Sequence, residues 1–137
     1  MTAARFALIF GIIYTLVGIA GFFPSLVSPP TGNRHLALGA LHGNLLGLFP
    51  VNFLHSLFHL AIGAWGLLAA MSYGAPVVYA RTVAIIYGVL AAMGLIPGLN
   101  TLFGLIPLHG HDVWLHAGSA LIAAYFGFVI KHEAERA

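Results

Sequence analysis

The sequence has no cysteine and very few charged side chains. Charged residues make up 6% of the 137 positions, whereas 61% are hydrophobic. The lack of cysteine excludes disulfide bonds and thiolate metal ligands, and it leaves the redox compartment open. So few charges cannot cover a water-soluble protein, and they form no basic patch of the kind that binds nucleic acid. The composition therefore indicates an integral membrane protein whose first partner is the lipid bilayer.

The sequence contains long apolar segments. Four of them, at about 6–27, 51–73, 77–96 and 113–130, approach the roughly 20 residues that a helix needs to cross a bilayer. The first follows Arg5 as a signal peptide would, but it lacks a clear cleavage site and other membrane segments follow it. The sequence predicts a single transmembrane domain over residues 1–137, an all-α bundle of four helices.

The few positive charges predict the orientation of these helices. Lys and Arg are enriched in short cytoplasmic segments. With four crossings, Arg5, Arg81, Lys131 and Arg136 share one side, and Arg34 is alone on the other. We therefore expect both termini to be cytoplasmic, with the starts of the second and fourth helices toward the periplasm or a lumen.

Two parts of the sequence repeat each other. The motif Gly-Leu-Phe-Pro at 47–50 recurs 57 residues later as Gly-Leu-Ile-Pro at 104–107. At the same spacing, two histidines of the first copy align with an aspartate and a histidine of the second: His55 with Asp112, and His59 with His116. These four are the ionisable side chains that lie inside the apolar segments near the repeat.

The repeat extends upstream and predicts the symmetry of the bundle. Tyr14 and Gly21 align with Tyr87 and Gly94 at a spacing of 73, so the first copy is 16 residues longer between its halves. Each copy is then a hairpin of two helices. Because two crossings return the chain to the same side, we expect the hairpins to be related by a pseudo-twofold axis along the membrane normal.

The spacing within each copy predicts a polar cluster. His55 and His59 stand at i and i+4, as do Asp112 and His116, so each pair lies on one helix face about 6 Å apart. Ionisable groups that face lipid are costly and usually point to other protein. We therefore expect all four side chains to converge inside the bundle.

Small residues on the same helices predict close contacts between helices. They are Gly11, Gly18 and Gly21 on the first helix, Gly63, Ala64 and Gly66 on the second, and Gly118 and Ala120 on the fourth.

The blocks Asn52-x-x-His55-x-x-x-His59 and Asp112-x-x-x-His116 resemble those of a bacterial family of small four-helix integral membrane proteins. That family is catalogued only as a domain of unknown function. The resemblance covers nearly the whole chain, although Ser56 stands where relatives usually carry Asn. It implies the fold and the polar residue set, and it implies no reaction.

One functional hypothesis is a metal site. The ligands would be the imidazoles of His55, His59 and His116 and the carboxylate of Asp112. Zinc accepts this set, and copper or iron can use the same nitrogens. An open coordination position would allow a metal-bound water and make the protein a hydrolase.

A second hypothesis is binding of haem or another pigment, with His59 and His116 as axial ligands. No Cys-x-x-Cys-His motif is present, so covalent haem attachment is excluded.

The third hypothesis, which the sequence favours, is structural. Asn52 and Asp112 would cap the second and fourth helices, and the histidines would hydrogen-bond to one another, to Asp112 and to backbone. The protein would then be a non-enzymatic accessory or structural subunit of a larger bacterial membrane complex. No nucleophile motif, phosphate-binding loop or acidic pair marks a catalytic site. The other non-cytoplasmic histidines are expected in solvated loops: His35, His42, His109 and His111.

Overall fold

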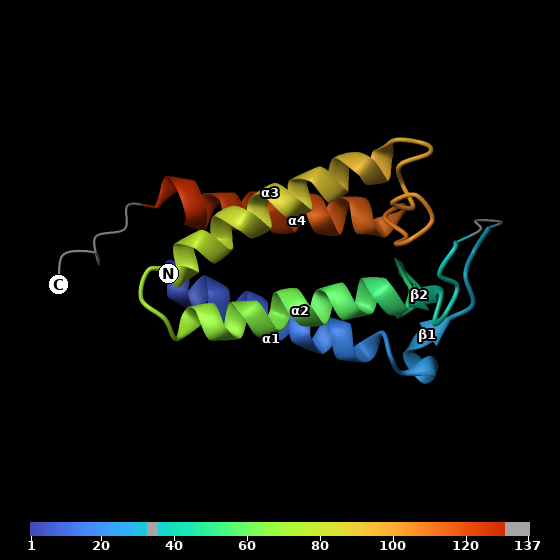
Figure 1. Ribbon diagram of the computed structural model, residues 1–137, viewed down its shortest axis with the longest axis horizontal. Helices are drawn as coiled ribbons and strands as arrows, with labels where there is room; N and C mark the ends of the chain where they lie inside the picture. The colour runs from blue at the N-terminus through green and yellow to red at the C-terminus, as the bar shows by residue number, and fades with distance from the viewer. Residues whose placement is uncertain (33–35, 131–137) are drawn as a thin grey trace.

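The computed structural model describes residues 1–32 and 36–130, and four helices dominate it (Figure 1). They are α1 (Ala3–Ala20), α2 (Phe53–Ala70), α3 (Ala75–Leu95) and α4 (His111–Ala124), which continues as the π-helical segment η2 (Tyr125–Val129). Each of the four is long and apolar enough to cross a membrane. The prediction of a four-helix membrane protein is confirmed.

The first helix is shorter than predicted. It ends at Ala20 instead of near residue 27, and the short 3-10 helix η1 (Pro24–Leu26) follows it. Proline disfavours the helical conformation of the residue before it, and Phe23 is accordingly extended, with φ −98° and ψ 110°. Apolar character therefore continues beyond the point where the backbone leaves the helix.

A small sheet closes one end of the bundle, and the sequence analysis did not predict it. It contains β1 (Val27–Ser28), β2 (Gly43–Leu45) and β3 (Phe49–Val51), which are antiparallel in the order β1-β2-β3. The turn between β2 and β3 places Leu46 and Gly47 in the left-handed region, with φ of 53° and 74°. Strands of two or three residues are too short to show the alternating pattern that identifies a strand.

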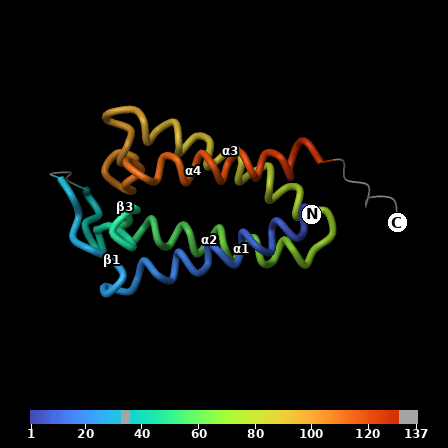
Figure 2. The backbone as a smooth tube through the Cα atoms, turned by 180° about the vertical axis from the view of Figure 1, so that it is seen from behind, coloured from blue at the N-terminus to red at the C-terminus, as the bar shows by residue number. Residues whose placement is uncertain are grey.

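The chain forms two helical hairpins. The helix α1 packs mainly against α2, and α3 packs mainly against α4. The N-terminus, the α2–α3 connection and the end of α4 lie at one end of the bundle, and the sheet and the α3–α4 loop lie at the other (Figures 1 and 2). The N-terminus and the end of η2 at Val129 are thus on one side, as four crossings require.

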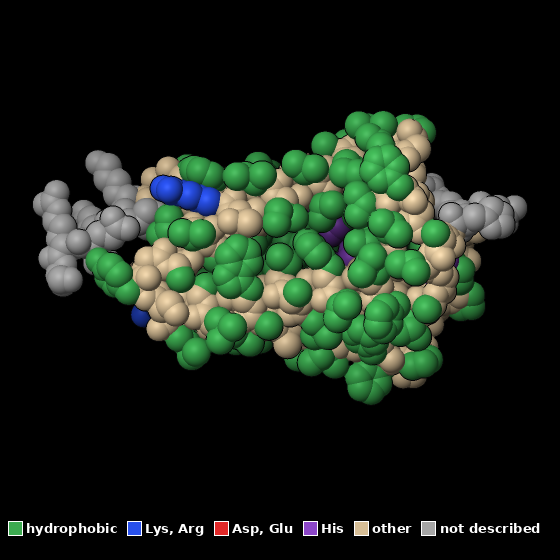
Figure 3. All heavy atoms as spheres, in the orientation of Figure 1, with side chains coloured by type: hydrophobic (Ala, Val, Ile, Leu, Met, Phe, Trp, Pro, Cys, Tyr) green, Lys and Arg blue, Asp and Glu red, His purple; other side chains and the backbone are tan. Residues whose placement is uncertain are grey.

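The orientation of this bundle in a membrane stays a prediction. Arg5 and Arg81 lie in the early turns of α1 and α3, at the end that carries the N-terminus, where Figure 3 shows arginine side chains. Arg34, Lys131 and Arg136 lie outside the described residues.

Residues that the repeat aligns occupy matching places. The rings of Tyr14 and Tyr87 meet, with centroids 5.2 Å apart. The pairs Leu46–Gly47 and Phe103–Gly104 both adopt positive φ. A pseudo-twofold axis would produce both observations, and the axis itself stays a prediction.

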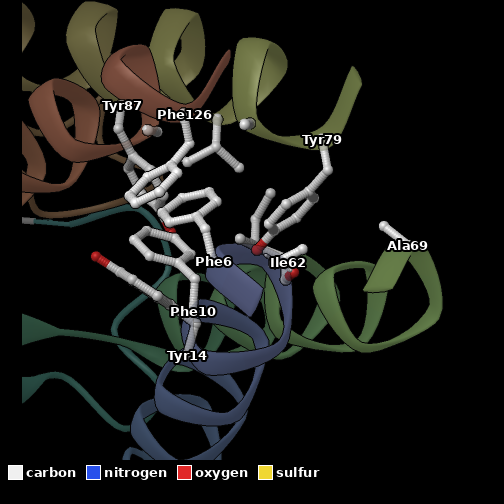
Figure 4. Packing of buried hydrophobic residues seen from close by; sticks show 12 residues of the cluster. Phe6, Phe10, Tyr14, Ile62, Ala69, Tyr79, Tyr87 and Phe126 are labelled. Carbon is white, nitrogen blue, oxygen red and sulfur yellow. Dashed lines mark hydrogen bonds between the residues drawn. The ribbon is translucent and has the colours of Figure 1, made fainter. Parts of the chain in front are cut away.

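Aromatic side chains from α1, α3 and η2 pack against one another inside the bundle (Figure 4). Phe6 stacks on Phe126 with ring centroids 5.0 Å apart, and Phe10 contacts both Tyr14 and Tyr87. This core joins α1 to α3 and η2, and it therefore fixes one hairpin on the other.

Glycines set the separation of α1 and α2, as predicted. A Cβ added at Gly11 would lie 2.7 Å from the Leu67 backbone nitrogen, and one at Gly63 would collide with the Thr15 backbone. The corresponding prediction for Gly118 is wrong, because nothing lies within 4 Å of its Cβ position among the described residues.

Candidate functional site

Four polar side chains meet inside the bundle near the end that carries the sheet. His55 and His59 come from the first two turns of α2, and Asp112 and His116 come from the start of α4. Each is at most 2% exposed. The predicted convergence of the two helices on one polar cluster is therefore what the structure shows.

The three histidines form a compact group. One ring nitrogen of each lies within 4.8 Å of the others. The ring centroids of His55 and His59 are 4.4 Å apart, and those of His55 and His116 are 5.7 Å apart. Asp112 lies at the edge of this group, where its Oδ2 is 3.7 Å from His55 Nδ1.

The polar atoms of this cluster lack partners. Within the described part of the chain, the six ring nitrogens of His55, His59 and His116 and both carboxylate oxygens of Asp112 make no hydrogen bond. The backbone of Pro50 approaches His55 without a well-formed bond. Buried polar groups are nearly always paired in folded proteins, since an unpaired one costs about 1–3 kcal/mol. The hydrogen-bonded network that the structural hypothesis requires is not formed by the described residues.

Asn52 caps α2, as predicted. Its Oδ1 accepts from the backbone N–H of His55 at 2.9 Å. Its Nδ2 donates to the carbonyls of Leu38 at 3.0 Å and Leu105 at 2.7 Å. This one side chain thus ties the loops before α2 and before α4 to the helix that carries two of the histidines.

Asp112 does not cap α4, which corrects the prediction. The N-cap residue is Gly110, and Asp112 is already inside the first turn. Its carboxylate is turned toward His55, because α4 begins two residues earlier than the apolar pattern indicated. A negative charge in this first turn still interacts favourably with the helix dipole.

Two tyrosines that the repeat aligns hold two of the histidine rings, and the sequence analysis did not assign them to the site. Tyr14 meets His59 edge-on at 5.1 Å, and Tyr87 stacks on His116 at 5.0 Å with an interplanar angle of 20°. The Tyr14 hydroxyl is hydrogen-bonded to Ser119 Oγ at 2.7 Å. Their aligned positions in the sequence repeat are the signal that could have assigned these two tyrosines to the site.

The remaining described histidines lie outside the group of three. His42 precedes β2, and partial burial lowers its pKa below the ordinary value. His109 belongs to the loop before α4. His111 is the first residue of α4 and accepts a hydrogen bond from Trp114 Nε1 at 2.8 Å. His35 lies outside the described residues.

Comparison with known proteins supplies a family and no activity. No curated protein and no solved structure is significantly similar to the chain. Residues 4–129 match the family described as "Domain of unknown function (DUF4383)", and the match includes all four helices and the whole polar cluster. The chain therefore belongs to the DUF4383 family of proteins of unknown function.

Proposed function

We propose that this membrane protein binds a transition metal ion through His55, His59 and His116. The observation that carries the proposal is the presence of three fully buried imidazoles whose ring nitrogens make no hydrogen bond within the described part of the chain and approach within 4.8 Å of one another. Neutral imidazole is a ligand of zinc, copper and iron. Bonds from these nitrogens to a metal would remove the cost of burying them unpaired.

Zinc is the metal that this donor set suits best. The chain has no cysteine, so the soft thiolates that favour copper(I) are missing. Zinc–nitrogen bonds of about 2.0–2.1 Å in a tetrahedral site place ligand atoms roughly 3.4 Å apart. The three nitrogens lie within 4.8 Å of one another, so binding would require them to move closer together.

Asp112 supports this site in one of two ways. At 3.7 Å from His55 Nδ1, its carboxylate can hold that ring so that Nε2 faces the metal. A shift of the carboxylate toward the three histidines would instead make it the fourth ligand. In both arrangements the metal offsets the cost of a buried carboxylate, which is high for an isolated charge.

The proposal is one of binding, and it names no reaction. Three protein ligands leave a position for a water or a further ligand, as in catalytic zinc sites. In the orientation that the arginines favour, the ion would enter from the periplasm or a lumen. The accessory-subunit hypothesis stays a prediction that is compatible with a metal site, because a subunit can carry an ion.

The same geometry disfavours a haem held by His59 and His116. A macrocycle between these rings needs a clear plane, yet the His55 ring lies 4.4 Å from that of His59. Binding of haem would require His55 and its helix turn to move.

Elemental analysis of protein purified in mild detergent tests the proposal. We expect about one zinc ion per chain, as for other histidine sites at neutral pH. Loss of the metal in His59→Ala and His116→Ala, but not in the control His42→Ala, would support these ligands, because His42 lies outside the group of three.

Cobalt substitution gives an independent readout, since tetrahedral cobalt bound by imidazoles absorbs visible light. Protein that retains no metal and binds neither added zinc nor added cobalt would contradict the proposal. A Soret band would favour haem, and a metal-free protein that purifies with larger subunits would favour the accessory hypothesis.

A further inference from the structure

The end of the bundle that carries the sheet exposes large apolar side chains instead of charged ones. We call this the sheet end; its described residues are 21–32, 36–52 and 96–110, and none of them is Asp, Glu, Lys or Arg. Leu46, in the turn between β2 and β3, is 65% exposed, and Phe103, in the α3–α4 loop, is 74% exposed. Figure 3 shows hydrophobic side chains over this end. Exposed apolar surface of this kind marks contact with another protein or with a membrane.

The two most exposed of these side chains occupy equivalent positions of the sequence repeat. Leu46 and Phe103 are 57 residues apart, as the repeated motifs are. Both have positive φ, of 53° and 58°, and each precedes a glycine that also has positive φ. The left-handed conformation is unfavourable for side chains of this size. Each hairpin nevertheless uses such a turn to expose one large apolar side chain.

The backbone of the sheet end forms many hydrogen bonds within itself. The N–H groups of Leu102, Leu105 and Ile106 donate to carbonyls of the α3–α4 loop. The N–H groups of Leu46 and Leu48 donate to carbonyls of η1 and β2. Where water is scarce, backbone polar groups must be paired inside the protein. The sheet end therefore loses less on leaving bulk water than an open loop would.

The length of α1 indicates that hydrocarbon extends to the sheet end. Arg5 is exposed in the first turn of α1, and a charged side chain favours the membrane surface. The remaining helical residues, 6–20, span only about 22 Å, whereas the hydrocarbon core is about 30 Å thick. Trp114, 56% exposed near the start of α4, is of a residue type enriched at the membrane–water interface. An apolar environment that starts at Arg5 therefore continues past Ala20 toward the sheet.

We propose that the sheet end is embedded in the bilayer, at the boundary between hydrocarbon and headgroups, with Leu46 and Phe103 in contact with lipid. Its apolar surface continues the exposed apolar faces of the four membrane-spanning helices. Figure 1 shows β1 and the α3–α4 loop on opposite sides of this end. Lipid surrounds a protein and reaches both sides, whereas one docked protein would cover one side. The proposal does not depend on a bound metal, and it puts the polar cluster below the membrane surface.

Spin labels on single cysteines test the proposal, and the chain has no native cysteine to interfere. The full chain carries a nitroxide at Leu46→Cys or at Phe103→Cys in phosphatidylcholine vesicles, and collisions with oxygen and with a water-soluble nickel complex are compared. Leu121→Cys, at a position of α4 that is 74% exposed, is the control for contact with lipid. Ser72→Cys, exposed in the connection between α2 and α3, is the control for contact with water.

We expect labels at positions 46 and 103 to collide more often with oxygen than with the nickel complex, as at position 121, because hydrocarbon excludes the polar complex. The label at position 72 should show the opposite order. That opposite order at 46 and 103 would overturn the proposal, because both side chains would then be in water. Few collisions with either reagent would also overturn it, because protein would cover both side chains. Magnetic broadening between labels would identify that protein as a second copy of the chain.

Discussion

The two hairpins share short sequence motifs but differ in packing at some of their glycines. In the first, Gly11 and Gly63 let the backbones of α1 and α2 approach until no Cβ fits. In the second, nothing lies within 4 Å of the Cβ position of Gly118 among the described residues, and the neighbour of Gly88 is at 4.0 Å. Other glycines are closely packed in both hairpins, because a Cβ at Gly21 would collide with Ser56 and one at Gly94 with the Leu108 backbone. The difference is therefore local: the contact at Gly63 is tight, whereas Gly118 has open space beside it.

The starts of α2 and α4 also differ, in whether a side chain caps the helix. Asn52 caps α2 and binds two loop carbonyls, whereas Gly110 precedes α4 without a side-chain cap. The link from α4 back to α2 is instead the approach of Asp112 to His55. The start of α2 is thus capped by a side chain that also binds the loop before α4, whereas the start of α4 has no side-chain cap.

The largest effect on stability should come from placing a side chain in the tight contact between α1 and α2. We expect Gly63→Leu to lower the free energy of unfolding by about 3 kcal/mol or more, because the added Cβ collides with the backbone of Thr15. Gly118→Leu is the same substitution at a position of α4 where nothing lies within 4 Å of the added Cβ among the described residues. It should be neutral or stabilising by up to about 1 kcal/mol, since leucine favours a helix more than glycine does. Thermal unfolding in detergent, followed by circular dichroism, measures both, and equal destabilisation would contradict the difference in packing between the two positions.

A smaller effect is expected from removing the cap that only the first copy has. Asn52→Ala should cost about 2 kcal/mol, because it removes an N-cap and leaves the Leu38 and Leu105 carbonyls without this donor. Asn100→Ala, in the loop between α3 and α4, is the control and should cost less than about 0.5 kcal/mol. Equilibrium unfolding of the two variants compares them directly. A cost at position 52 no greater than at position 100 would show that Asn52 does not hold the two loops.

The smallest effect should come from exchanging the aligned polar residues. If a pseudo-twofold axis relates His55 and Asp112, the double variant His55→Asp/Asp112→His keeps the same donors in the cluster and should bind zinc within about tenfold of the original. Asp112→Ala alone should weaken zinc binding by about 10- to 100-fold, as loss of a carboxylate that orients a histidine ligand does elsewhere. Competition with a chromophoric chelator measures both affinities. A swap that is as damaging as Asp112→Ala would argue against the symmetry.

Much of the fold followed from the sequence, and the errors have local causes. The four helices were predictable because hydrocarbon excludes unpaired backbone groups and sets a minimum length of apolar chain. The end of α1 was misplaced because apolar residues continue past Ala20, where Pro24 stops the helix. The sheet was missed because its strands of two or three residues are defined by pairing across a loop and not by a pattern of their own.

Some features of the candidate site could also be predicted from the sequence, and others could not. The sequence by itself determined which residues would be polar and buried, because i, i+4 spacing places His55 with His59 and Asp112 with His116 on single helix faces. Only the tertiary structure decided that Asp112 faces His55 instead of capping α4, and that Tyr14 and Tyr87 pack against the histidine rings. These features depend on the separation and rotation of α2 relative to α3 and α4. Helix positions of that kind are set by the packing of side chains far apart in the chain, which no local spacing specifies.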